Sequence, residues 1–481
     1  MNYGIRFEYQ NPWTEANNNM SNYDLASGNI VLAGRNGVSS GIINKRKDDI
    51  SPRLGFAYAL SPRTVIRAGG GIFFSPENDG REDFMTKNAP FAEQAVYSNW
   101  AFNVSSPSDW PFYQDDAGQP RNTTINIPSA GFIQPKNLAN GTLETTYAVD
   151  PKLKTGTAGS FNFAIERQLS RTIALDVSYV GTTSRHLSYS ISDINADPSL
   201  GGSAKDYDGL ITPDLGKIQY LSDYGMSNYN ALQVKLMQQS SRNTNFLVSY
   251  TYSHSLDNGP APWDIGNNND APQNPYNLTA EYATSDSDIR HNLVASGDYN
   301  LPFGRGQRFG ATWAPAVNAI LGGWKFGGIF SLHSGTPVNV ILGDDPKSAL
   351  AGLRPDLTSD PSRSNHLSDP NLPSGQRNFL KYFNTSAFTA PTIPQGAAYA
   401  YGDAGRNLVV GPGFVNIDAS LAKDFAIENR FTLQVRAEAF NGTNTVHYNN
   451  PDGNFQNGTF GSILSTKGDE RRAQLAAKIL F

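Results

Sequence analysis

The chain closes with RRAQLAAKILF, Arg471 to Phe481, in which apolar residues recur at every second position. One side of an extended chain here carries Ala473, Leu475, Ala477, Ile479 and Phe481, and the other side carries Gln474, Ala476 and Lys478. This period of two is typical of a β-strand whose two faces meet different environments. Chain ends are usually polar and frayed unless something holds them. An apolar row that ends on an aromatic residue therefore predicts contact with a second sheet or with lipid, and we favour lipid.

The composition excludes helical membrane spans but does not exclude a transmembrane β-barrel. Charged residues make up 17% of the 481 residues and aromatic residues 11%, whereas soluble domains are roughly 25% charged. No run approaches the ~18 apolar residues that a spanning helix needs. Barrel strands alternate lipid-facing and lumen-facing residues, so their average is polar. The net charge of -5 predicts no nucleic-acid partner, and the absence of cysteine excludes disulfides and thiolate metal sites.

Alternating segments predict about twelve long strands in six pairs. The predicted strands cover residues 2–10, 53–60, 64–74, 160–168, 172–181, 230–238, 245–254, 289–301, 324–340, 414–425, 430–440 and 471–481. Short turns alternate with long polar connections such as 75–157 and 341–412. This sorting is typical of an antiparallel transmembrane β-barrel with short periplasmic turns and long extracellular loops. Only Pro302 to Gly322 is unusually long for a periplasmic turn.

Mid-strand charges occupy the positions that alternate with the apolar rows, namely Arg67, Glu166, Asp176, Lys235, Asp298, Asp418, Arg436 and Glu438. In a wide barrel they line a watery or plugged lumen, and in a soluble β-sandwich, the alternative, they would face solvent. A turn centred on Ser241 predicts Val234 opposite Val248. Centring the last hairpin on its turn predicts Arg436 opposite Asp418. Such an exposed ion pair would add only about 0–1 kcal/mol.

Chemical motifs are weak along the whole chain. A G-x-S-x-G pattern occurs at Gly37 to Gly41, but neither a strand precedes it nor a helix follows it. The six histidines lack the spacing of zinc ligands. We therefore expect neither enzymatic activity nor a cofactor. Trp100, Trp110 and Trp263 in predicted loops are candidates for stacking on a sugar or peptide, and packing within their own loops is an equal alternative.

Several segments carry a family resemblance together. They are SNYNALQVKL (227–236), YTYSHSLDN (250–258), SDSDIRHNLVASGDYNLPFG (285–304), LGGWKFGGIFSLHSGTPVNV (321–340), NPYNL (274–278), GRNLVVGPGFVNIDASLAKDF (405–425), FTLQVRAEAFNGTN (431–444) and the closing strand. The set resembles the TonB-dependent outer-membrane receptors of the Oar-like group, in the family's order and over most of the chain. The resemblance implies a barrel of about 22 strands around a plug, energised through a TonB box by the inner-membrane TonB complex.

The beginning of the sequence departs from that pattern. MNYGIRFEYQ (1–10) lacks the features of a secretory signal, and its alternating Tyr3, Ile5, Phe7 and Tyr9 place the start inside a strand. We therefore expect residues 1–481 to be one domain, the C-terminal part of a receptor barrel from a Gram-negative bacterium. The plug and the first strands are expected to be absent from this fragment, which leaves a partial barrel.

These observations predict a location in the cell outer membrane. The leading hypothesis is a receptor and transporter barrel for a large ligand, such as an oligosaccharide, a peptide or a chelate. The alternatives are a non-transporting structural or adhesion barrel and, third, a secreted soluble carbohydrate-binding β-protein. Expected partners are outer-membrane lipid and the barrel-assembly machinery, whose signal would be Leu475, Ala477, Ile479 and Phe481. The TonB complex is expected as a partner only if the full-length protein carries a plug and a TonB box.

Overall fold

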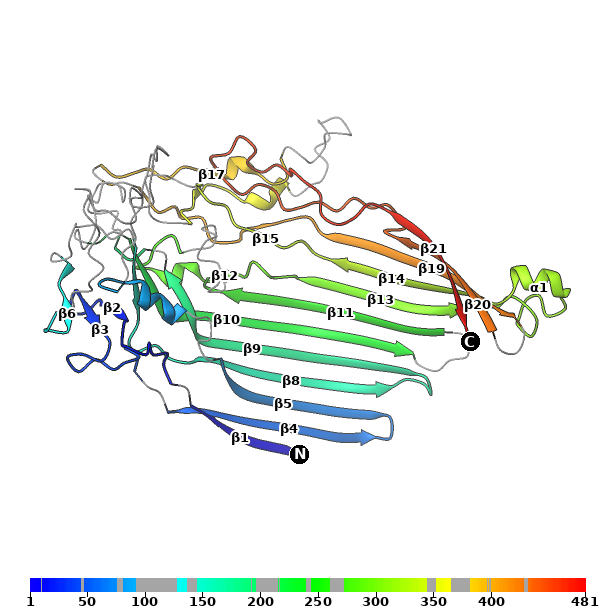
Figure 1. Cartoon of the computed structure of the whole chain (residues 1–481). Helices are drawn as coiled ribbons and strands as arrows, with labels where there is room; N and C mark the ends of the chain where they lie inside the picture. Colours follow the sequence, from blue (N-terminus) through cyan, green and yellow to red (C-terminus); the bar gives the residue numbers. More distant parts are fainter. Residues whose placement is uncertain are drawn as a thin grey trace, which may run out of the picture.

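The structure is a computed structural model of the whole chain, drawn in Figure 1. It describes residues 1–481 except 10, 45–46, 76–80, 92–127, 136–144, 192, 196–214, 216, 239–243, 260–271, 344–351, 365–380, 396, 398 and 428–430. The described residues form an all-β fold. None of the helices among them has the length and apolar character needed to cross a membrane.

Twelve long strands form one continuous antiparallel path, which we call the wall (Figure 1). In spatial order they are β1 (Asn2–Glu8), β4 (Asp49–Ser61), β5 (Thr64–Ser75), β8 (Gly156–Gln168), β9 (Ile173–Ile191), β10 (Lys217–Gln238), β11 (Thr244–Asp257), β13 (His291–Asn300), β14 (Trp324–His333), β19 (Phe414–Ile427), β20 (Phe431–Phe440) and β21 (Arg472–Leu480). Spatial order follows chain order, so every neighbouring pair of long strands is joined directly. The predicted twelve antiparallel strands are confirmed.

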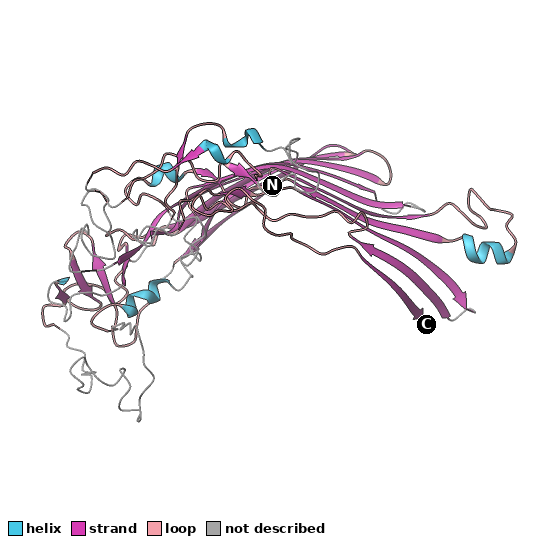
Figure 2. Ribbon diagram, turned by 90° about the horizontal axis from the view of Figure 1, so that it is seen from above, coloured by secondary structure: helices cyan, strands magenta, loops and turns pink. Residues whose placement is uncertain are grey.

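The wall is curved and open along its two edge strands (Figure 2). Among the described residues, β1 pairs only with β4, and β21 pairs only with β20. The hydrogen-bonding groups on their outer edges therefore face no strand in this part of the chain. Within the described residues the wall is therefore a curved, open sheet.

The connections are sorted by length to the two ends of the wall (Figure 1). At the turn end, β4 and β5 are separated by two residues and β19 and β20 by three. The long connection between β13 and β14 also lies at the turn end, as predicted, and contains α1 (Pro315–Leu321). The Lys423 ammonium group donates a hydrogen bond to the Ala319 carbonyl in this helix, at 2.6 Å. A cation near the last turn of a helix also interacts favourably with the helix dipole.

The two faces of the wall differ in character, because side chains alternate along each strand. The apolar face carries aromatic and aliphatic rows, and Ile5 and Leu475 on it are 78% and 85% exposed. The polar face carries the charged residues predicted to lie together, with Asp176 opposite Lys235. A soluble sandwich would bury the apolar face under a second sheet, so the soluble interpretation is wrong.

The hairpin of β10 and β11 differs in register from the prediction. Val234 lies opposite Tyr250 and Leu236 lies opposite Val248, which is a shift of two residues. The hairpin is centred at residue 242, one position beyond the predicted centre. A shift of two keeps every side chain on its predicted face, because strand side chains alternate with a period of two.

The last hairpin is shifted by four residues from the prediction. Arg436 lies opposite Ala422, so the predicted Arg436–Asp418 ion pair is wrong. Arg436 Nε instead lies 3.0 Å from Glu438 Oε1, on its own strand. Asp418 accepts a hydrogen bond from the backbone N–H of Asn441 at 2.9 Å. The prediction failed because β19 continues to Ile427 and moves the turn towards the C-terminus.

Most of the buried hydrophobic residues gather at the loop end, since a single-layer wall encloses no core. Short elements form there: β2 (Ser21–Asp24), β3 (Asn29–Leu32) and β6 (Phe132–Ile133) in one sheet, β7 (Thr145–Val149) beside β10, β12 (Ala283–Thr284) beside β11, β15 (Pro337–Val338) with β18 (Val409–Val410), β16 (Asp356–Leu357) with β17 (Phe388–Thr389), and the 3-10 helices η1 (Arg81–Lys87), η7 (Leu278–Glu281), η8 (Pro361–Ser364) and η9 (Thr385–Ala387).

Two clusters illustrate how these elements hold together. In one, Ile30 and Leu32 of β3 pack with Tyr189 at the end of β9. In the other, Phe383 and Phe388 meet edge to face, with ring centres 5.9 Å apart. The loop end is thus a packed layer that includes the outer ends of β9 and β10.

Candidate functional site

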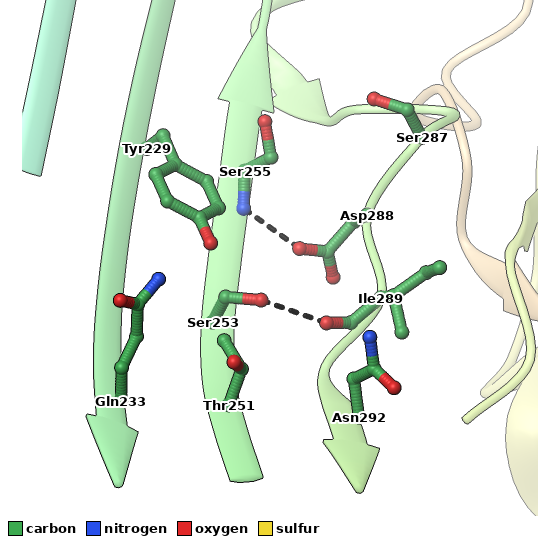
Figure 3. A pocket seen from close by; sticks show the side chains of 9 residues that line it. All are labelled: Tyr229, Gln233, Thr251, Ser253, Ser255, Ser287, Asp288, Ile289 and Asn292. Atoms are coloured by element: carbon green, nitrogen blue, oxygen red, sulfur yellow. Dashed lines mark hydrogen bonds between the residues drawn. The ribbon is translucent and has the colours of Figure 1, made fainter. Parts of the chain in front are cut away.

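A cavity of about 240 Å³ opens on the polar face near the loop end. It lies between β10, β11 and the segment that leads into β13 (Figure 3). Its lining consists almost entirely of hydroxyl, amide and carboxylate side chains: Tyr229, Gln233, Thr251, Ser253, Ser255, Ser287, Asp288, Ile289 and Asn292. We call it the polar cavity.

Strand register explains why these side chains meet. Gln233 lies opposite Thr251, and Thr251 lies opposite Asn292 on the next strand. Tyr229 lies opposite Ser255, further towards the loop end. Positions two apart on a strand share a face, so the odd-numbered residues of β10 and β11 stand together with Lys235 on the polar face.

Hydrogen bonds fix one wall of the polar cavity. Asp288 is buried, and one of its carboxylate oxygens accepts a hydrogen bond from the Ser255 backbone N–H at 2.7 Å (Figure 3). Its other oxygen lies 3.3 Å from the Arg290 guanidinium. The Ser253 hydroxyl donates to the Ile289 carbonyl at 2.8 Å. The carboxylate charge is therefore used internally and is not presented to a ligand.

Four other lining groups have no hydrogen-bond partner within the part of the chain that the structure describes. They are the hydroxyls of Tyr229 and Thr251 and the amides of Gln233 and Asn292. None of these side chains is buried, so each is free to donate to or accept from a bound molecule. This arrangement suits binding by hydrogen bonds.

The row continues across two further strands. Asn292 lies opposite His333, and His333 lies opposite Phe414. The His333 and Phe414 rings stack with centres 5.0 Å apart and planes within 9°. His447 also stacks on Phe414, with ring centres 4.0 Å apart. Among the described residues, no group of three or more His, Cys, Asp or Glu could hold a metal ion.

Two buried ion pairs lock the loops above the wall, and we call this set the loop junction. Arg354 donates to both carboxylate oxygens of Glu281, at 2.7 and 2.9 Å, and both side chains are only 1% exposed. Arg406 pairs with Asp257 at the end of β11. Gln273 adds a hydrogen bond from its backbone N–H to Glu281 at 3.2 Å. The junction joins segments that lie as much as 149 residues apart in the sequence.

The predicted site residues lie elsewhere. Trp100, Trp110 and Trp263 are outside the described residues. Leu475, Ala477 and Ile479 stand on the apolar face of β21, and Phe481 follows directly, 95% exposed. The prediction missed the residues of the polar cavity. Their only signal was the run of polar residues at alternate positions in YTYSHSLDN (250–258).

An antiparallel wall with one apolar face, one charged face and loops sorted by length defines a transmembrane β-barrel protein. Residues 1–474 match the family model described as the outer membrane beta barrel domain, and the chain belongs to this family. The predicted location in the outer membrane is thereby confirmed. In such barrels the loop end faces outside and the turn end faces the periplasm.

Several solved structures resemble the chain at low sequence identity. The outer membrane transporter YddB from Escherichia coli is 10% identical, with a TM-score of 0.43 over 93% of this chain and 43% of that one. The ferripyoverdine receptor of Pseudomonas aeruginosa is 9% identical, with a TM-score of 0.40 over 93% and 34%. The FrpB iron transporter from Neisseria meningitidis is 10% identical, with a TM-score of 0.39 over 91% and 40%. The chain thus spans less than half the length of each. No curated protein matches it.

Proposed function

We propose that this chain is the wall of an outer-membrane receptor that imports a large ligand in a TonB-dependent manner. The observation that carries the proposal is the set of unpartnered hydrogen-bonding groups in the polar cavity, on the inner face and just below the loop end. A molecule that enters from outside reaches this level directly after it passes the loops. We infer a binding and transport role without catalysis.

The loop junction supports the proposal by setting the rim above the cavity. Arg406 ties the end of β11 to the segment that precedes β19, and β11 supplies Thr251, Ser253 and Ser255 to the cavity. Binding groups held on strands are more precise than groups held on free loops. Energy for import would come from the TonB complex through a plug and TonB box in the full-length protein.

A non-transporting adhesion or structural barrel is the second candidate function. The packed layer of short strands and buried clusters at the loop end favours it, because a folded outer surface can bind a partner without any passage through the lumen. Under this alternative, changes in the polar cavity would leave function unaffected.

Uptake measurements separate these two functions. The full-length gene is expressed in its host, and a library of labelled oligosaccharides, peptides and ferric chelates is offered to cells with and without a functional TonB complex. Import predicts TonB-dependent accumulation of one ligand, lost on deletion of the gene. Heat-modifiable protein in the outer membrane, with attachment to surfaces as the only phenotype of the deletion, would support the adhesion barrel instead.

We also infer that β21 is the segment that barrel-assembly machinery recognises. The strand lies at an edge of the wall, and its exposed row Leu475, Ala477 and Ile479 ends on Phe481. An unpaired edge offers backbone groups for strand addition, and alternate side chains offer specificity.

A further inference from the structure

We infer that the ligand of the polar cavity is a neutral oligosaccharide, an inference that rests on the proposed import function. The chemistry of the free groups points to this class. The side-chain amides of Gln233 and Asn292 each present two hydrogen-bond donors and one acceptor. The hydroxyls of Thr251 and Tyr229 can each donate and accept a hydrogen bond. Sugar hydroxyls also both donate and accept, so they match this mixed set.

The pairing of charges on the polar face argues against an anionic chelate. On the polar face, Arg67 pairs with Glu166 at 2.7 Å, Lys325 pairs with Asp298 at 3.1 Å, and Arg290 lies against Asp288. Lys235, two positions from Gln233, lies opposite Asp176 and interacts with its opposite charge without a direct ion pair. A ligand with several negative charges would need cations that are not already compensated, because an unpaired charge taken out of water is costly.

The dimensions of the site favour a chain-like ligand. A volume of about 240 Å³ is below the ~300–1,000 Å³ of pockets that enclose a whole drug-sized molecule. The cavity therefore holds one unit of a longer ligand. Gln233, Thr251, Asn292, His333 and Phe414 continue the same row over five strands. Four strand spacings of about 4.8 Å make the row about 19 Å long.

Aromatic rings lie beside this row: Tyr229 on β10, four residues from Gln233, and a stacked pair at the far end. Tyr229 lines the polar cavity itself, and the stacked pair is His333 and Phe414. A sugar ring has an apolar face of C–H groups, which packs on an aromatic ring such as that of Tyr229 while its hydroxyls remain free to form hydrogen bonds. The Phe414 ring is already stacked with His333 and His447, so it bounds the row at its far end. A peptide carries fewer hydroxyl groups than a sugar chain, so it would use fewer of the free hydrogen-bonding side chains in the polar cavity.

Calorimetric titration of the full-length protein in detergent tests the inference. The probes are maltohexaose, cellohexaose, xylohexaose and mannohexaose, with hexagalacturonate, a ferric tris-catecholate chelate and a hexapeptide for contrast. We expect one neutral hexasaccharide to bind. Gln233→Leu, Thr251→Val and Asn292→Leu should each weaken its Kd about fivefold, as expected for loss of one hydrogen bond.

The matched control is Asn162→Leu, the same change on the polar face of β8, opposite Gly69 and Val180 and away from the cavity. It should leave the Kd unchanged. Tighter binding of hexagalacturonate, the chelate or the peptide overturns the inference, as does no saccharide binding at millimolar concentration. Equal Kd values for the cavity variants and wild type overturn it as well.

The uptake assay separates this inference from the proposed function. TonB-dependent import of a charged ligand would leave the receptor function standing and refute the oligosaccharide. Tight binding of a neutral hexasaccharide, sensitive to the cavity variants but without any uptake by cells, would support the ligand class and refute import.

Discussion

Replacing Glu281 with alanine should release the loop end while the wall stays folded. The variant leaves the Arg354 guanidinium buried, with the Ala404 carbonyl, 2.8 Å from Nε, as its remaining acceptor. Removing one partner of a buried ion pair costs about 3–5 kcal/mol, because the other charge stays without compensation. The junction opens locally in this case, since the wall is held by its own strand ladders.

Hydrogen exchange measures that local opening directly. The backbone N–H groups of Arg354 and Ala404 are bonded to Gln273 and Pro355, at 3.2 and 3.1 Å, and become exchangeable when the junction opens. A loss of 3–5 kcal/mol accelerates their exchange by about two to three and a half orders of magnitude. Amides in the centre of the wall should keep wild-type protection.

Two further variants test whether charge is the cause. In Glu281→Leu/Arg354→Met both charges are removed together, and replacing a buried pair by apolar residues is often nearly neutral. This double variant should recover most of the protection. Asp469→Ala, which removes an exposed ion pair with Arg472, should change nothing at the junction. The reasoning would be refuted if the single and double variants accelerated exchange of these amides equally, or if Glu281→Ala accelerated it less than tenfold.

Three other predictions concern separate parts of the molecule. Deletion of Phe481 should lower the amount of heat-modifiable barrel in outer-membrane fractions without changing ligand affinity, and unchanged assembly would leave β21 only a structural role. Gly402→Ala should loosen the junction in the same exchange assay, because a Cβ there would lie 2.1 Å from the Arg354 carbonyl oxygen; wild-type protection would contradict this. Burial by itself would raise the pKa of Asp452. Hydrogen bonds from Thr459, Asn454 and Asn457 lower the pKa by more than burial raises it, so the pKa is below its ordinary value of 3.8. The carboxylate accepts these bonds from residues 454, 457 and 459, and its contribution to the stability of segment 452–459 is complete above pH 3.8 and is lost as the pH falls below that value. Pepsin cleavage within this segment should therefore rise there relative to the other loops, and Asp452→Asn should abolish that rise.

The sequence predicted the strands well, because alternation is a local signal. The predicted strand 64–74 is β5 almost to the residue, and 471–481 is β21. The strands β9 and β10 are longer than predicted, extending to Ile191 and from Lys217. Their outer parts lie among the loops, where both faces carry polar residues and the apolar alternation that marks a membrane strand stops.

The register and the cavity could not be obtained from the same signal. Alternation has a period of two and is therefore blind to shifts of two or four residues, which is how far the two hairpins were misplaced. The partners of Glu281 and Arg406 lie far away along the chain, and no periodic pattern connects them. Likewise, Thr251 and Asn292 meet only because two hairpins adopt a particular register.

The separation between a wall without a core and a packed loop end has a consequence for how the chain folds. Two solvents act on one polypeptide. In lipid, the wall gains from pairing every backbone group, and apolar side chains gain nothing by clustering. In water, the loop end gains from removing residues such as Phe383 and Leu32 from solvent. A denaturant dissolved in the aqueous phase should therefore unfold the loop end first, while the strands of the wall stay paired in the membrane.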